Sequence, residues 1–153
     1  MQLSAADIKA YPKFAKYVSL SMPEIAQVAM IVAKIKQLAG KISTAKIKES
    51  LVWGKGPMVT VADLAADTNG EFSPDISSNE IRVARPRVVQ FESGKGLEKT
   101  KYGRLIYIVG TILLHELTHW ADDQDGVDHP EEEGKKFEEA MYGKDIGNLP
   151  IVP

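Results

Sequence analysis

The chain has 153 residues, of which 44% are hydrophobic and 26% are charged, and its formal net charge at pH 7 is −2. A chain of this length and composition is expected to form one domain with a buried core. The charge gives no electrostatic reason to expect nucleic acid or an anionic membrane as a partner. Cysteine is absent, which excludes disulfides and thiolate metal sites, so any metal would be bound by histidine and carboxylate side chains.

The N-terminus predicts no signal peptide, because residues 1–7 have neither a basic start nor an apolar core. The longest apolar run, residues 105–114, is about half as long as a membrane span. We therefore expect no membrane span, and export of this domain would need a carrier.

Residues 1–50 are expected to be helical. Ser4 is suited to cap a first short helix, and residues 21–24 have the pattern of a capping box with proline in the first turn. Apolar residues at helical spacing then predict a helix over residues 25–38 and a shorter one over about residues 44–51. We interpret this part as scaffold, because the apolar face of an amphipathic helix usually packs in a core.

The middle of the chain is expected to form a small sheet. Residues 58–61 and 80–84 have the composition of short strands, and residues 88–91 form a further apolar run. Residues 67–75 are dense in turn formers. Pro86 favours an edge strand or a bend at this end of the sheet.

A long apolar helix is expected from about Lys101, and it contains the motif H-E-x-x-H at His115, Glu116 and His119. Two histidines four residues apart lie on one helix face, so both rings can bind one metal ion. Glu116 lies about 100° further around the helix, where it can act as a general base on water. The alternative, two hydrogen-bonded core histidines, would leave the buried glutamate beside them without an explanation.

A last helix is expected from Pro130 to the C-cap at Gly143, and it carries our preferred third ligand. A catalytic zinc site typically has three protein ligands and one open position. Eighteen residues separate His119 from Glu138, which is the spacing of the gluzincin peptidases. Gly134, one turn before Glu138, would let this helix approach another backbone closely.

Other candidates for the third ligand remain open. Asp125 stands where metzincin-type peptidases have their third ligand, but Asp122 replaces the glycine that those enzymes need. Glu133 is explained more simply as an acid favoured by the positive end of the helix, and His129 is a further candidate ligand or transition-state donor. Tyr142 is a candidate catalytic residue that could stabilise an oxyanion, or it could simply pack at the helix end.

Several sequence motifs together resemble the zincin-like metallopeptidase toxin domains of bacteria. These domains form the C-terminal ends of polymorphic toxins and of type VI secretion spike or Rhs-type effectors. The similarity runs from about Gly56 to Gly143, with a looser match in residues 1–50. H-E-x-x-H occurs in many peptidase families, and the pieces that narrow the resemblance are Asn69-Gly70-x-Phe72-x-Pro74-Asp75, Asp125-Gly126, Glu133-Gly134-x-x-Phe137-Glu138 and Tyr142-Gly143.

The resemblance implies an α+β, zincin-like fold in a single domain, residues 1–153, with the catalytic core at residues 56–143. It also implies a zinc endopeptidase, carried as cargo of a larger effector into the periplasm or cytoplasm of a competing or host cell, and a cognate immunity protein. In zincins an edge strand pairs with the extended peptide substrate, which makes Ile81, Arg82 and Val83 candidate substrate-binding residues.

Two other functions are compatible with part of the pattern. A catalytically silent zincin-fold binding module would keep its metal for stability, but Glu116 argues against it, since a structural zinc needs no base and usually has four protein ligands. A housekeeping SprT-like protease is expected to contain a basic or zinc-ribbon region, and this chain has neither.

Overall fold

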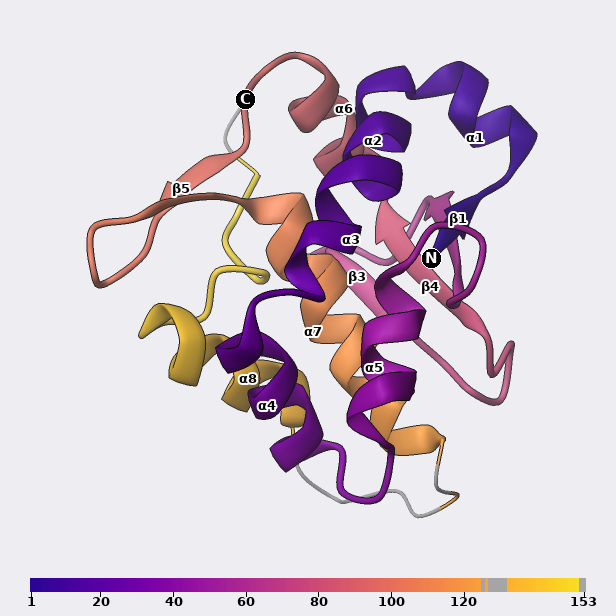
Figure 1. Ribbon diagram of the computed structural model, residues 1–153. Coiled ribbons are helices and arrows are strands. Elements are labelled where there is room, and N and C mark those ends of the chain that lie inside the picture. The colour runs from indigo at the N-terminus through magenta and orange to yellow at the C-terminus, as the bar shows by residue number, and fades with distance from the viewer. Residues whose placement is uncertain (125, 127–131, 152–153) are drawn as a thin grey trace.

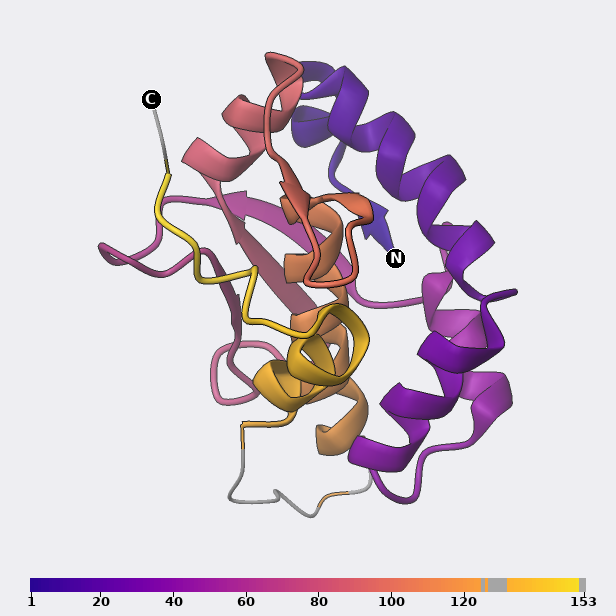
Figure 2. The ribbon, with the colours of Figure 1, turned by 90° about the vertical axis from the view of Figure 1, so that its left-hand side faces the viewer.

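A computed structural model describes residues 1–124, 126 and 132–151 of the chain. Helix α7 (Ile108–Asp123) lies at the centre, and nearly all of its residues are buried. It runs between a small sheet and the N-terminal helices (Figures 1 and 2). The long apolar run therefore contributes to a central helix, as its hydrophobic pattern predicts, and the H-E-x-x-H residues begin at the middle of this helix and continue into its C-terminal half.

The sheet has four strands in the order β1-β2-β4-β3. β1 (Gln2–Leu3), β2 (Met58–Ala62) and β4 (Glu80–Ala84) are parallel, and β3 (Gly70–Phe72) is antiparallel to β4. Buried and partly exposed residues alternate along β2, as expected for a strand with one face on the core. Helix α7 contacts β3 and β4, so this sheet supports the motif helix directly.

The prediction that residues 81–83 form an edge strand is wrong. β4 pairs with β2 on one side and with β3 on the other, so it has no free edge. The edge strand on this side is β3, which lies in the segment that the turn formers marked as a loop. Three residues are too few for a hydrophobic period to reveal a strand from the sequence.

The N-terminal third is helical, as predicted, but its helices are shorter and more bent. Ser4 caps the first helix, since its hydroxyl accepts from the backbone N–H of Asp7. Ser21 caps nothing, because it lies inside a helical stretch that includes a π-helical turn. The elements are α1 (Ala5–Ala10), α2 (Pro12–Lys16), η1 (Tyr17–Ser21), α3 (Met22–Ile25), α4 (Ala29–Leu38) and α5 (Thr44–Leu51).

The helix predicted over residues 25–38 begins only at Ala29, after a sharp bend between α3 and α4. The helix predicted over residues 44–51 is confirmed. Within the described residues no single helix is both long and apolar enough to cross a membrane. One pair of helical segments, Pro12–Ile25 and Ala29–Leu38, has the required length and composition when the two are counted together. The chain bends by 88° between them.

Two further elements differ from the prediction. Residues 88–91 belong to helix α6 (Arg85–Glu92), and Pro86 lies in its first turn, where proline is favoured. The motif helix does not begin near Lys101, because β5 (Leu97–Lys99) and β6 (Leu105–Tyr107) form a hairpin there.

Helix α8 (Glu133–Tyr142) packs against α7 and α4. It ends at Gly143, which has a φ of 76°, so the predicted glycine C-cap is confirmed. Its predicted start at Pro130 lies outside the described residues. After α8 the chain is irregular, as expected, but Ile146 is fully buried in the core.

Candidate metal centre

Three side chains in the described part of the chain could hold one metal ion: His115, His119 and Glu132. One ligand atom from each lies within 4.8 Å of the others. Tetrahedral zinc with bonds of about 2.0–2.1 Å needs ligand atoms about 3.3 Å apart, so small side-chain rotations would close the site. Two histidines and one carboxylate, with room for a fourth ligand, are the donor set of a catalytic zinc site.

A carboxylate from α8 lies beside the Nδ1 atom of each histidine. His115 Nδ1 donates to Glu138 Oε1 at 2.6 Å, and His119 Nδ1 lies 3.3 Å from Glu133 Oε2. Such contacts select the tautomer with Nδ1 protonated, in which Nε2 is the nitrogen that can bind a metal. Burial lowers the pKa of His115, but the hydrogen bond to Glu138 and the charge of Glu116 raise it above its ordinary value overall.

Glu138 therefore lies behind His115, and it is not a member of the group that could hold a metal. Its side chain is fully buried, and its second oxygen, Oε2, accepts from the backbone N–H groups of Ile146 at 2.5 Å and Gly147 at 2.7 Å. Both oxygens are thus engaged away from the ligand group. Where the spacing predicts Glu138 as the ligand, the structure brings Glu132 to the two histidines.

The close packing of α8 on α7 gives the physical reason for this arrangement. A Cβ on Gly134 would lie 2.2 Å from Cδ2 and 2.4 Å from Nε2 of His115. Only glycine lets the first turn of α8 lie this close to the imidazole. Gly134 does permit a close approach of α8, but the group that it approaches is the side chain of His115, whereas the sequence predicts another backbone.

Glu116 is also buried, and it lies against the edge strand β3. A Cβ on Gly70 would lie 2.6 Å from Glu116 Oε1, and the backbone N–H of Phe72 donates to the carboxylate. Burial is the largest cause that raises the pKa of Glu116, which reaches about 7, although His115 opposes the change. A carboxylate with a pKa near the working pH is suited to act as a general base.

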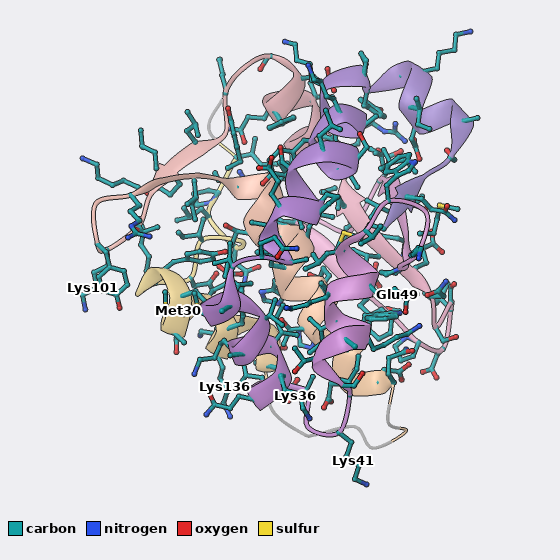
Figure 3. All side chains as sticks on the ribbon, in the orientation of Figure 1. Met30, Lys36, Lys41, Glu49, Lys101 and Lys136 are labelled. Atoms are coloured by element: carbon teal, nitrogen blue, oxygen red, sulfur yellow. The ribbon has the colours of Figure 1, made fainter. Side chains whose placement is uncertain are left out.

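Glu116 and the three candidate ligands line a cleft of about 760 Å³. Its other wall is formed by β3 and the turn after it, including Phe72 and Asp75. Among the described residues no lysine or arginine lines this cleft. Lys41, Lys101 and Lys136 extend outward elsewhere on the surface (Figure 3).

Tyr142 is not brought into this cleft. It bonds to Thr111, one turn before His115, and it lines a separate apolar cavity of about 590 Å³. Burial, the largest cause, raises the pKa of Tyr142 well above its usual range. The structure therefore favours the packing interpretation of Tyr142.

The proposed substrate residues on β4 do not line the cleft either. Ile81 and Val83 are fully buried in the core, and Arg82 forms an ion pair with Glu71 of β3 at 3.1 Å. Two candidate ligands, Asp125 and His129, lie outside the described residues.

Sequence reasoning did not identify Glu132 or the contact between Gly70 and Glu116. Glu132 stands in a run of three glutamates, residues 131–133, at the start of the predicted last helix, where acids suit the positive helix end, and no spacing rule separates one of them from the next. Gly70 was read as a turn residue. Both roles depend on how distant segments pack.

One family comparison covers most of the chain. The family model described as Metallopeptidase toxin 3 matches residues 7–143, which include the whole of α7 and α8 and also the N-terminal helices. No curated protein and no solved structure matches the chain. The resemblance seen in the motifs is thus confirmed, and the chain belongs to the metallopeptidase toxin 3 family.

Proposed function

We propose that this domain is a zinc-dependent peptidase of the zincin type, in which His115, His119 and Glu132 hold the metal ion. The observation that carries the proposal is the cleft in which these three side chains surround one point beside the buried Glu116. Zinc is the metal that best suits this donor set, because two imidazoles and one carboxylate with an open position characterise its hydrolytic sites.

In this proposal Glu138 and Glu133 orient the histidines. Glu138 holds His115 through Nδ1 at 2.6 Å, and Glu133 faces Nδ1 of His119 at 3.3 Å. Carboxylates in such positions fix the ring orientation and raise the basicity of the ligand nitrogen. The role of Glu138 thus changes from ligand to orienting partner.

Glu116 is the proposed general base. Bound zinc would supply Lewis acidity, polarising a peptide carbonyl and acidifying water. Glu116 accepts a proton from the water that attacks the carbonyl carbon, and then gives that proton to the leaving amine. In the metal-free site, burial is the main cause that raises the pKa of Glu116 to about 7.

The free edge of β3 is the proposed binding strand for an extended peptide. In the described part of the chain β3 pairs with β4 and with no other strand, and Gly70, Glu71 and Phe72 all line the cleft beside Glu116. A peptide added to this edge would form main-chain hydrogen bonds with its scissile bond close to the base. The strand that offers an edge is β3, in place of the β4 residues chosen from the sequence.

Membership of the toxin family supports a further part of the proposal, which concerns the substrate of the domain and its delivery into a target cell. A peptidase toxin acts on protein, and we propose that this domain travels as cargo of a larger secreted effector into a competing or host cell. A cognate immunity protein in the producing cell follows from the same proposal. The resemblance to effector domains and the family match support these statements.

The test compares three variants for zinc content and for cleavage of a mixed protein substrate. We expect Glu116→Gln to keep zinc and lose cleavage, because the base alone is removed. We expect His119→Ala to lose both, and Glu139→Gln, an exposed neighbour on α8, to lose neither. Full cleavage by Glu116→Gln would refute the mechanism, and toxicity without cleavage in that variant would favour a binding module.

A further inference from the structure

The segment 146–149, which follows α8, lies beyond the residues that the family model matches. Figure 2 shows the C-terminal segment in yellow, running from the end of α8 back toward α6. It has no regular secondary structure, yet Ile146 at its start is fully buried. Two sets of hydrogen bonds hold it, one at each side of the candidate metal centre.

The first set connects the segment to Glu138. The backbone N–H groups of Ile146 and Gly147 both donate to Glu138 Oε2, at 2.5 and 2.7 Å. A Cβ on Gly147 would lie 2.6 Å from Glu138 Oε1, so glycine permits this approach. Two amide donors to one buried oxygen set the orientation of the carboxylate, which directs Oε1 at His115 Nδ1.

The second set connects the same segment to Asn69. The side-chain amide of Asn69 donates to the backbone carbonyls of Gly147 at 2.8 Å and Leu149 at 3.3 Å. Its Oδ1 accepts from Nε of the buried Arg87 at 3.0 Å. Arginine can only donate, so the oxygen must face Arg87 and the NH₂ group must face the two carbonyls.

Asn69 also stands directly before Gly70, the residue of β3 that lies against Glu116. One buried side chain therefore joins the segment behind His115 to the strand beside the general base. The chain of contacts runs from Asn69 through Gly147 and Glu138 to His115, and each step is a hydrogen bond or a peptide unit.

We propose that Asn69 is a positioning residue of the metal centre, which acts through the segment 146–149 and Glu138 on the ring of His115. The inference rests on the proposed role of His115 as a metal ligand. If Asn69 holds the carbonyls of this segment, the amides of Ile146 and Gly147 stay on Glu138, and Glu138 keeps its hydrogen bond to His115 Nδ1. A purely structural Asn69 would affect folding alone and leave metal affinity unchanged.

The experiment uses the whole chain with Asn69→Ala, Asn69→Asp and a control, Thr100→Ala. Asn69→Asp keeps the acceptor for Arg87 and loses the donors to the carbonyls, so it keeps a partner for the buried arginine. Thr100 is buried, and its hydroxyl accepts from the backbone N–H of Arg104 in the hairpin, away from the cleft. Its removal provides a comparable loss of one buried hydrogen bond.

Three quantities are measured: the Zn²⁺ dissociation constant by competition with a chelator, the melting temperature of the metal-free protein, and the NMR signals of the His115 ring nitrogens. We expect both Asn69 variants to raise the zinc dissociation constant by about tenfold, the lower end of the effect of losing an outer partner. We also expect the Nδ1–H signal of His115 to shift. Thr100→Ala should lower the melting temperature and change neither zinc affinity nor the His115 signals.

The results separate this inference from the proposed function. A wild-type protein that binds no zinc would refute the metal centre itself. Wild-type zinc affinity and unchanged His115 signals in Asn69→Asp would overturn the positioning role while the metal centre stands. If Asn69→Ala does not fold, Asn69→Asp decides the question, because its partner Arg87 remains paired.

Discussion

Gly134→Ala is the sharpest test of how the two helices form the site. The added Cβ would lie 2.2 and 2.4 Å from two atoms of the His115 ring, where about 3.5 Å is a normal carbon contact. An overlap of about 1 Å in a packed interior must be relieved by movement of the ring or of α8. Either movement disturbs the 2.6 Å hydrogen bond between His115 and Glu138.

The energetic cost follows from these contacts. Overpacking of this kind lowers the free energy of unfolding by about 1–3 kcal/mol. The higher helix propensity of alanine raises it by up to about 1 kcal/mol. A domain with a stability of about 5–15 kcal/mol should therefore remain folded. Because the clash falls on Nε2, we expect zinc affinity to fall by about 10–100-fold, as for the loss of an orienting partner.

Chelator competition measures the zinc affinity, and a thermal melt of the metal-free protein measures the folding cost. Lys135→Ala, the next residue on the exposed face of α8, is the matched control and should leave both values unchanged. Zinc affinity and cleavage at wild-type levels in Gly134→Ala would refute the packing argument, because they would mean that the space beside Nε2 is not used.

Three other predictions follow from the same site. Glu138→Gln should lower zinc affinity by about 10–100-fold, and Glu132→Gln should lower it further, as measured by chelator competition. A larger loss in Glu138→Gln would indicate that Glu138 is the ligand. In the metal-free protein the raised pKa of Glu116, about 7, means that the folded state binds the proton more tightly than the unfolded state does. Stability should therefore fall as the pH rises from about 4.5 to 7, by up to about 3 kcal/mol, and urea unfolding should show no such contribution in Glu116→Gln. Gly70→Ala should place a Cβ 2.6 Å from Glu116 Oε1 and lower kcat/KM by about tenfold with zinc content unchanged; a loss of zinc instead would show that β3 supports the ligands rather than the base.

Local sequence patterns identified the central motif helix correctly. The relation between His115, Glu116 and His119 depends only on helix geometry, so their placement on one buried helix could be read from spacing. The α+β class, the helix over residues 44–51 and the glycine C-cap of α8 were predictable for the same reason.

The edge strand could not be identified in this way. β3 is three residues long and lies among turn formers, so its pairing with β4 appears only when distant segments meet. Likewise, residues 88–91 are an apolar run that is too short to distinguish a strand from a helix without its neighbours.

The sequence by itself determined that His115, Glu116 and His119 lie together on one buried helix, because their relation depends on helix geometry alone. Only the tertiary structure shows which glutamate lies within reach of both histidines, because Glu132, Glu133 and Glu138 lie close together along the chain and differ mainly in how α8 packs on α7. Gly134 lets the first turn of α8 lie against the ring of His115, and Glu138 of the same helix lies at Nδ1 of that ring. Glu132, the residue before the helix, lies within reach of both histidines.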